Sequence, residues 1–590
     1  MQLIVRYIKK YKVLFLTGLG LKLLAAIAEL LIPYVLEYII DSVAPKGEIR
    51  LVLFWGALMI FLALSVRFIN VTANRIAIRQ SKLSTYDIRR EFFLKTLALS
   101  GNQFDDFTLP SLTSRMTSDS YNVQNFLRAL QTMGVRAPIM LFGGILITLV
   151  MDRGLAMILC VLAPIMVLLI VTISRKGIPL YDKVQNRLDD VVRIMRENIT
   201  GIRVVKSLSK EEYEENRYGK ANSDLTSDDL KAGVIMALPG PLLTLILNIG
   251  LTLVVIVGAR RVNAGITKPG VILAFLTYFN MILMGVMGLN RIFILLSKAT
   301  ASADRISAVI NSGEELNVIP KKDAAKTESG AFIVFDDVSF RYGADSEAGQ
   351  DDDPGDRFAG ESRRMSLSNI SFEIRKGGSL GIIGATGSGK TTIVNLLMRF
   401  YDPTSGHVFI GGKDVRTYKN DELHSKFGVV FQNDVIFADS ISGNIIFGRD
   451  VDEAGVKSAA RDACAAEFIE GYEDAYDHPA EIRGSNFSGG QKQRILIARA
   501  LAAKPEILIL DDASSALDYK TDASLRKAIA ENHEGSTTIV IAQRISSIMN
   551  LDEILFLDEG EVLGLGTHEQ LMKNCPKYLD IFNTQMGEGS

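Results

Sequence analysis

The first 300 residues contain six long apolar stretches. They fall at roughly 13–40, 51–74, 133–151, 154–174, 232–258 and 271–297. Each holds about twenty or more mostly apolar residues, the length that a bilayer core demands of a helix. Only a helix satisfies its own backbone hydrogen bonds across such a run in lipid. The pattern therefore predicts six transmembrane helices.

The first apolar stretch shares features with a secretory signal peptide. A basic segment precedes it, and Ala26-Ile27-Ala28 has the small-residue spacing of a cleavage site. However, the apolar run continues through Leu30 to Ile40, so the whole segment is long enough to span a bilayer. We therefore predict a retained membrane span.

The connections between these stretches differ in length. Residues 41–50, 152–153 and 259–270 are short, whereas 75–132 and 175–231 are long, polar and poor in turn residues. We expect the long connections to be helices that continue out of the membrane. An even number of spans puts both long connections on the same side as the soluble second half. Their many lysines and arginines indicate the cytoplasmic side of a cytoplasmic (inner) membrane.

The pattern changes in the second half of the chain. Residues 301–330 have the character of a linker, and after Ala331 short β-rich runs such as AFIVFDDVSF alternate with helical stretches. The expected fold class is an α-helical six-span transmembrane domain, followed by an α/β domain. The predicted domains are 1–300, a linker at 301–330, and 331–590.

Composition excludes several other classes of protein. Hydrophobic residues make up 48% of the chain and the net charge is −2, so no basic field indicates a nucleic-acid partner. Three well-separated cysteines form no pair typical of a disulfide framework or a zinc site. The acidic stretch 343–366 lacks periodicity; we interpret it as a surface loop, with a regulatory or partner-binding element as the alternative.

Two motifs in the second half predict a nucleotide site. GATGSGKT (384–391) follows the apolar strand LGII and matches a phosphate-binding loop, in which backbone N–H groups, Lys390 and the next helix surround phosphate oxygens. The Thr391 hydroxyl is a candidate magnesium ligand. A strand ending in Asp511 (ILILD) comes about 120 residues later and would hold magnesium through water. The second domain is therefore expected to be an α/β P-loop nucleotide-binding domain, with ATP and Mg²⁺ as its cofactors.

A third motif predicts a second anion site. FSGGQKQR (487–494) opens a helix, with Ser488 as its N-cap and glycines that expose backbone N–H groups. One chain has one phosphate loop, so a second anion site calls for a second nucleotide. The simplest arrangement is a head-to-tail dimer in which each chain's SGGQ closes on the other's ATP. The residues assigned to this role are Ser488, Gly489, Gly490 and Gln491.

With these motifs in place, the chain resembles an ATP-binding-cassette exporter half-transporter over nearly its whole length. The resemblance implies that Tyr342 stacks on adenine, that Gln432 touches magnesium, and that Asp518 links the two sites. It also implies two cytoplasmic coupling segments, at 105–119 and 209–219. The implied ATP-binding set is Tyr342, Gly384, Ala385, Thr386, Gly387, Ser388, Gly389, Lys390, Thr391, Thr392 and Gln432; the implied metal set is Thr391, Gln432 and Asp511.

The sequence departs from this family at two catalytic positions. After the magnesium aspartate the family usually has a glutamate that orients water, whereas this chain has Asp512. The stretch IVIAQR has Gln543 where the family usually has histidine. Glutamine donates hydrogen bonds but carries no charge. We expect a site that binds ATP and hydrolyses it slowly; drift in an active homodimer is the alternative.

The intact SGGQ motif serves the opposite site. The resemblance therefore implies a heterodimer whose second half-transporter chain supplies the catalytic Glu and His. The expected function is ATP-driven export of amphipathic, multidrug-type compounds through the lipid membrane. Met281, Met284 and Met287 are candidate contacts for a hydrophobic small-molecule substrate, and Tyr278, Phe279 and Asn280 are candidates to face a cavity. Alternatives are a lipid or peptide exporter, a siderophore importer, and an ATP-gated channel or regulatory subunit.

Overall fold

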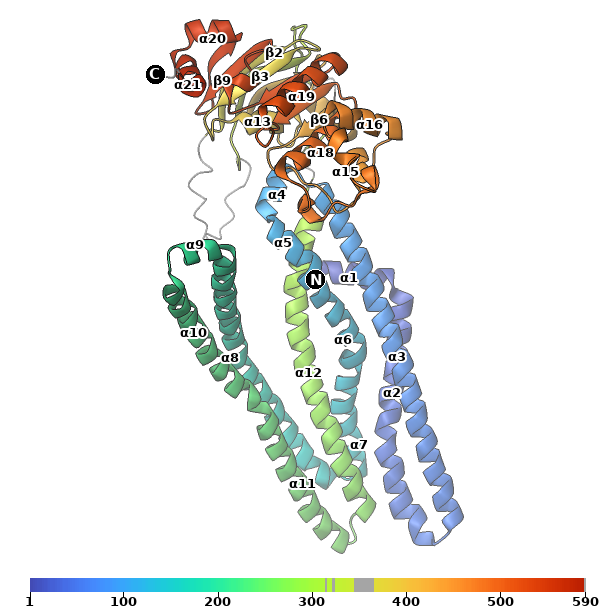
Figure 1. The fold of residues 1–590 in the computed structure, drawn as a ribbon. Helices are drawn as coiled ribbons and strands as arrows, with labels where there is room; N and C mark the ends of the chain where they lie inside the picture. Colours follow the sequence, from blue (N-terminus) through green and yellow to red (C-terminus); the bar gives the residue numbers. More distant parts are fainter. Residues whose placement is uncertain (314–315, 321–323, 344–364, 588–590) are drawn as a thin grey trace. The chain divides into compact units, whose positions relative to one another are not determined.

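The computed structural model describes residues 1–313, 316–320, 324–343 and 365–587 (Figure 1). Most of the acidic stretch 343–366 lies outside these ranges. The chain divides into two compact units. The first comprises residues 1–98 and 107–312, and the second comprises residues 99–106 and 313–590. The short segment 99–106 thus belongs with the second half, although it follows the second predicted span.

The first unit is entirely helical in its regular structure. Six helical segments of its chain are long and apolar enough to cross a membrane, and each contains one predicted span. These segments are Lys12–Lys46, Ile49–Leu97, Leu109–Met151, Arg153–Thr200, Glu211–Asn263 and Pro269–Ile310. Large apolar side chains such as Phe61, Phe68 and Val150 are mostly exposed on them. An exposed apolar surface of this extent marks contact with lipid.

The helices of the first unit run far beyond bilayer length, as expected for the long connections. Their bounds are α1 Gln2–Lys10, α2 Lys12–Tyr38, α3 Ile49–Leu97, α5 Leu109–Ser114, α6 Ser120–Pro138, α7 Gly144–Met151, α8 Arg153–Thr200, α9 Ile202–Ser207, α10 Glu211–Ala237, α11 Pro239–Asn263 and α12 Pro269–Ile310. The short helix α9 joins α8 to α10 at their tips (Figure 1). The expected coupling segment 209–219 forms the start of α10 rather than this short helix.

Helix α12 continues into the range predicted as linker. Its last turns bury Ala299, Ala303, Ile306 and Val309, a spacing of three to four residues that gives the helix one apolar face. The polar composition of residues 301–330 hid this stripe, so the helix ends about three turns later than the sequence indicated.

The second unit contains two sheets and short helices. A parallel core with one antiparallel edge has the order β10-β9-β3-β8-β7-β6, and an antiparallel sheet has the order β2-β1-β4-β5. The strands are β1 Ile333–Phe340, β2 Leu367–Ile374, β3 Ser379–Gly384, β4 Ser405–Ile410, β5 Lys413–Asp414, β6 Phe427–Val430, β7 Ile507–Asp511, β8 Thr537–Ile541, β9 Glu553–Asp558 and β10 Glu561–Gly566. The α-helices are α4 Gly101–Phe107, α13 Lys390–Leu397, α14 Asn420–His424, α15 Ile441–Ile446, α16 Glu453–Asp462, α17 Ala466–Ile469, α18 Gly489–Ala502, α19 Tyr519–Asn532, α20 His568–Asn574 and α21 Pro576–Met586.

Every residue of β7 is buried, which explains its uninterrupted aliphatic run. Parallel strands covered on both faces are apolar throughout. Ile507 and Ile509 face one hydrophobic cluster, and Leu508 and Leu510 face another. Because β3, β7 and β8 are parallel to one another, their carboxyl ends lie at the same edge of the sheet, where binding sites in α/β folds form.

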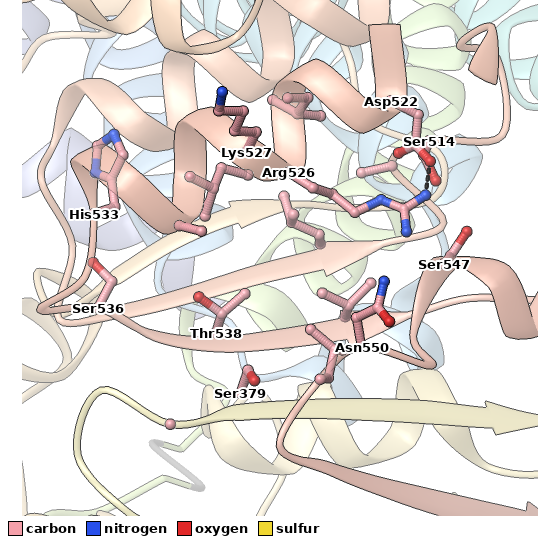
Figure 2. A pocket seen from close by; sticks show the side chains of 18 of the residues that line it. Ser379, Ser514, Asp522, Arg526, Lys527, His533, Ser536, Thr538, Ser547 and Asn550 are labelled. Atoms are coloured by element: carbon pink, nitrogen blue, oxygen red, sulfur yellow. Dashed lines mark hydrogen bonds and ion pairs between the residues drawn. The ribbon is translucent and has the colours of Figure 1, made fainter. Parts of the chain in front are cut away.

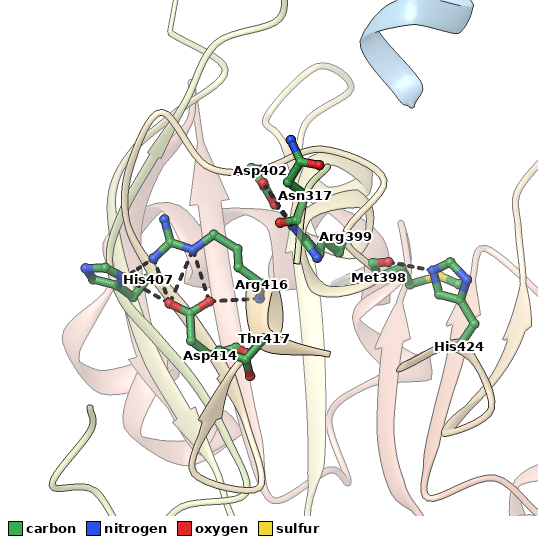
Figure 3. A network of polar contacts seen from close by, with 9 residues as sticks. All are labelled: Asn317, Met398, Arg399, Asp402, His407, Asp414, Arg416, Thr417 and His424. Carbon is green, nitrogen blue, oxygen red and sulfur yellow. Dashed lines mark hydrogen bonds and ion pairs between the residues drawn. The ribbon is translucent and has the colours of Figure 1, made fainter. Parts of the chain in front are cut away.

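Charged groups anchor the linker to the antiparallel sheet (Figure 3). Arg399 is buried and donates to the carbonyl of Asn317 at 2.8 Å. The N–H of Ile319 donates to the carbonyl of Arg416 at 2.9 Å. The guanidinium of Arg416 in turn pairs with the buried carboxylate of Asp414. These bonds hold residues 317 and 319 of the predicted linker against Arg399 and Arg416.

Candidate functional site

The loop between β3 and α13 has the backbone geometry of an anion cradle. Gly387 and Gly389 have φ of +83° and +95°, in the left-handed region that favours glycine. A Cβ atom on Gly384 would lie 2.2 Å from the carbonyl oxygen of Leu557, so the loop also passes very close to β9. These constraints explain three glycines of GATGSGKT and aim the loop at the N-terminus of α13.

Two side chains of the loop reach the end of the central strands. The ammonium of Lys390 lies over the loop and donates to the carbonyls of Gly384 and Ala385, at 2.9 and 2.7 Å. Burial lowers the pKa of Lys390. The Thr391 hydroxyl donates to Oδ2 of Asp511 at 3.2 Å, which joins the phosphate loop to the end of β7.

Two adjacent carboxylates lie at the end of β7 in different environments. Asp511 is only 2% exposed. Burial raises its pKa, the Thr391 hydrogen bond opposes this, and the charge of Asp512 raises the pKa further. Burial also raises the pKa of Asp512, against the nearby positive charges of Arg544 and Lys390. Because the pKa values of both carboxyl groups are raised, a nearby cation or a bound proton would stabilise them.

Asp512 and Gln543 contact each other directly. Nε2 of Gln543 donates to Oδ2 of Asp512 at 3.2 Å. The backbone N–H of Asp512 donates to the carbonyl of Ile541 at 3.0 Å, and its φ is +51°. Aspartate is among the few residues that adopt this left-handed conformation readily. The two residues that depart from the family pattern thus form one unit across β7 and β8.

The aromatic side chain of Tyr342 is held in a fixed orientation. Its hydroxyl hydrogen-bonds the Thr392 hydroxyl at 3.2 Å and accepts from Nδ2 of Asn395 at 3.3 Å. Phe340 and Tyr401 pack edge-on against the ring, with centroid distances of 4.8 and 5.2 Å. These contacts fix the ring at the border of the nucleotide cavity, which Tyr342 lines.

A cavity of about 580 Å³ collects most of the predicted site residues. Its lining contains Tyr342, Thr386, Gly387, Gly389, Lys390, Thr391, Thr392, Gln432, Asp511, Asp512 and Gln543. Sequence reasoning missed Met365, Ser366, Ile541, Ala542 and Glu559. Met365 and Ser366 directly precede β2, and Glu559 lies in the turn after β9. Sheet order and register bring Met365, Ser366 and Glu559 to the cavity, so no local motif marks them, whereas Ile541 and Ala542 directly precede Gln543 in the stretch IVIAQR.

The SGGQ motif and Asp518 do not line this cavity. Ser488 caps α18 as predicted: its hydroxyl accepts from the N–H of Gln491 at 3.3 Å, and the Gln491 side chain accepts from the N–H of Ser488 at 2.9 Å. Asp518 caps α19 and accepts from the N–H and hydroxyl of Thr521 at 2.9 and 2.7 Å. These bonds lower the pKa of Asp518, so it is an ionised cap.

The segment 99–106 packs on the aromatic cluster beside Tyr342. Oδ2 of Asp105 accepts from the Tyr401 hydroxyl at 2.8 Å, and the N–H of Gly101 donates to the carbonyl of Phe400 at 3.1 Å. A Cβ atom on Gly101 would lie 2.4 Å from the Tyr401 ring, so this close approach requires glycine. The first expected coupling segment thus begins on the second unit.

The oxygen atoms at the end of β7 suit magnesium. Mg²⁺ is usually bound by one or two protein oxygens together with substrate phosphates and water. The Thr391 hydroxyl and the Asp511 carboxylate provide such a pair beside the phosphate loop. Among the described residues no group of three or more His, Cys, Asp or Glu side chains forms a separate metal site.

Comparisons with known proteins agree with this architecture. The family description "ABC transporter transmembrane region" matches residues 15–287, and "ABC transporter" matches residues 367–515. The ABC transporter ATP-binding protein YfiB of Bacillus subtilis is 34% identical over the whole of both chains. Rv1273c of Mycobacterium tuberculosis is 31% identical, over 98% of this chain and 97% of the relative.

A solved structure extends the likeness to nearly the whole length of the chain. The structure of a bacterial Atm1-family ABC exporter with ATP bound is 25% identical, with a TM-score of 0.79 that covers 97% of this chain and 99% of the other. The six spans and the C-terminal cassette match that exporter fold, which places the cassette in the cytoplasm. The chain belongs to the ABC transporters, as a multi-pass membrane half-transporter with a fused ATP-binding cassette.

Proposed function

We propose that this chain is one half of a heterodimeric exporter, and that its own ATP site binds nucleotide but hydrolyses it slowly. The observation that carries the proposal is the pair formed by Asp512 and Gln543 at the edge of the nucleotide cavity. The cassette around this pair has the parts needed to bind ATP: the phosphate loop, Lys390, Thr391 and Asp511.

The physical argument for slow hydrolysis concerns reach and charge. Aspartate carries the charge of glutamate on a side chain one methylene shorter. A catalytic group displaced by about 1 Å can lose on the order of a hundredfold in rate. Gln543 can donate a hydrogen bond to a phosphate oxygen but cannot carry a positive charge. In addition, its Nε2 is already directed at Asp512.

The remaining site residues have separate proposed roles. Tyr342 stacks on the base, and the loop residues 384–389 surround the phosphates with Lys390 and Thr392. Thr391, Asp511 and Gln432 hold Mg²⁺, which when bound neutralises charge on the outer phosphates. Asp512 orients water in this site. These side chains come from four strand ends and one helix, so bound ATP would contact all of these elements at once.

The position of the SGGQ motif supports the proposed dimer. Ser488, Gly489, Gly490 and Gln491 form a capped helix start outside this chain's own cavity. Exposed N–H groups at a helix N-terminus bind anions. We infer that they close on ATP in a second half-transporter chain that carries the catalytic Glu and His. The partner site then turns over while this one stays closed for longer.

The proposed substrate is an amphipathic compound of the multidrug type. Asn280, Met284 and Met287 share one exposed face of α12, and methionine side chains adapt to varied apolar ligands. Tyr278 and Phe279, expected as cavity residues, are instead fully buried, and the Tyr278 hydroxyl donates to the carbonyl of Leu30. Tyr278 packs α12 against α2, and Phe279 packs α12 against α8 and α11, so neither is a substrate contact in this arrangement.

The test is ATP turnover in lipid nanodiscs, for this chain alone and for this chain co-expressed with its genomic neighbour. A nearly silent lone chain and an active pair would support the slow site and the heterodimer. Brisk hydrolysis by the lone chain would make Asp512 a competent base and the transporter a homodimer. Accumulation of a fluorescent amphipathic dye in inverted vesicles would test the direction of transport.

A further inference from the structure

A second cavity lies beneath α19, away from the phosphate loop (Figure 2). Its volume is about 500 Å³, within the range of pockets that bind small molecules. The strands β3, β8 and β7 form its floor, and α19 covers it. Its lining includes the exposed residues Lys527, Ala530 and Asn550, so the cavity opens to the surface of the cassette.

The cavity exists because α19 places few large side chains on the sheet. Leu525 and Ile529 are the two large apolar residues of the helix that face the cavity. Ala530 and Ser536 also line it, and their small side chains leave the remaining space unfilled. The sheet side of the lining contains the apolar residues Leu510, Val540 and Leu551 together with the hydroxyl groups of Ser379 and Thr538. An apolar body is therefore the favoured occupant of most of this volume.

One end of the cavity carries hydrogen-bond donors. Figure 2 shows Arg526 extending across this end, near Ser514, Ser547 and Asn550. Arg526 pairs with Asp522 and donates from one Nη atom to the carbonyl of Ser546 at 2.8 Å. A guanidinium has five N–H donors, so others remain. Within the described part of the chain, the side chain of Asn550 makes no hydrogen bond and is exposed.

The cavity also adjoins the catalytic pair through the backbone. Ala513 and Ser514 line it directly after Asp512, and Ile541 lines both this cavity and the nucleotide cavity. The N–H of Asp512 is bonded to the carbonyl of that same Ile541. Helix α19 itself begins at the cap Asp518. An occupant that shifts α19 on the sheet therefore acts on the strand end that positions Asp512.

We propose that this cavity is a regulatory site for a small amphipathic molecule, with an aromatic or aliphatic body and one head that accepts hydrogen bonds, such as a carboxylate or sulfonate. The body lies on the floor of β3, β8 and β7, and the head faces Arg526 and Asn550. Occupancy changes the rate of ATP turnover in the assembled transporter.

The test uses two matched probes on the full-length transporter in nanodiscs. The anionic probe is 1-anilinonaphthalene-8-sulfonate, and N-phenyl-1-naphthylamine has the same body without the sulfonate. The first variant, Ala530→Phe, fills the cavity mouth; its control, Ala523→Phe, adds the same ring to an exposed position of α19 outside the cavity. The second variant, Asn550→Leu, removes a donor from the polar end.

We expect the sulfonate probe to slow amide exchange in peptides covering 519–532 and 537–551. Ala530→Phe should weaken this binding at least tenfold, whereas Ala523→Phe should not. Asn550→Leu should weaken the sulfonate probe about threefold or more, with little effect on the neutral probe. Saturating sulfonate probe should change ATP turnover at least twofold in wild type and in Ala523→Phe, and leave Ala530→Phe unchanged.

Each contrary result overturns a defined part of the proposal. Unchanged exchange in both peptides at saturating probe, or equal affinity in wild type and Ala530→Phe, would mean that the cavity is not a binding site. Equal loss of both probes in Asn550→Leu would refute the assignment of the head. Probe binding without a change in turnover would refute regulation. Unaltered ATP affinity in Ala530→Phe shows that this variant is folded.

Discussion

Restoring the two family residues should convert the slow site into a working one. The perturbation is the double substitution Asp512→Glu and Gln543→His. The longer side chain moves the carboxylate by about 1 Å, a displacement that is worth on the order of a hundredfold in rate. At about 1.36 kcal/mol for each factor of ten, this corresponds to roughly 2.7 kcal/mol of transition-state stabilisation.

The two substitutions should be strongly coupled. Nε2 of Gln543 lies 3.2 Å from Oδ2 of Asp512, so changing either residue alone alters the partner of the other. Residues in direct contact show non-additive effects. We expect the full gain of about a hundredfold only in the double variant. Asp512→Glu alone should raise turnover by about tenfold or less, because Gln543 still bonds the carboxylate, and the double variant should exceed the product of the two single variants.

The assay is ATP hydrolysis by the assembled pair in nanodiscs, with the catalytic glutamate of the partner chain replaced by glutamine so that only this site contributes. Asp512→Asn is the matched control, because it keeps the shape and removes the base, and it should abolish residual turnover. A double variant that binds ATP normally but hydrolyses it no faster than wild type would refute the reasoning about reach and charge.

Three further predictions concern the rest of the cassette. In the assembled pair, Ser488→Ala should reduce ATP turnover at least tenfold, whereas Lys390→Ala, which disables only the slow site, should reduce it less; the reverse order would contradict the heterodimer. Tyr342→Ala should weaken ATP binding by about 1–3 kcal/mol, measured by titration, and Tyr342→Phe should retain most of the affinity. Burial raises the pKa of Asp414, but hydrogen bonds and charge from Arg416 outweigh it and hold the pKa below its usual value. Asp414→Asn should therefore destabilise β4 and β5 by about 3 kcal/mol at neutral pH, measured by amide exchange, and the difference from wild type should shrink as pH falls through the depressed pKa.

The membrane half was predictable because lipid imposes a length rule. A span must be apolar for about twenty residues, and each of the six predicted ranges lies inside one long helical segment. The end of α12 was not predictable in the same way. In its final turns the buried residues Ala303, Ile306 and Val309 stand among exposed charged residues. Over so few residues, the sequence pattern of a helix with one narrow apolar face resembles that of a polar linker.

The nucleotide cavity was predictable wherever the chemistry is local. Glycine spacing marks the phosphate loop, and an aliphatic run ending in Asp511 marks β7. By contrast, Glu559 and Ser366 reach the cavity only because β9 and β2 lie beside β3 and β1. Likewise, Asp105 is bonded to Tyr401 although 296 positions separate them. Contacts of this kind depend on strand order and register, which no short motif encodes.

Ile541, at the end of β8, lines both the nucleotide cavity and the cavity beneath α19. On one side, Ile541 and Gln543 line the nucleotide cavity, and on the other, Val540 and Ile541 line the cavity beneath α19. The carbonyl of Ile541 holds the N–H of Asp512, so any movement of this strand end changes the position of the shorter carboxylate. If this site holds ATP and hydrolyses it slowly, as proposed, it would tolerate such movement better than a site built for fast turnover. The cavity beneath α19 and the aspartate at position 512 would then serve the same proposed regulation.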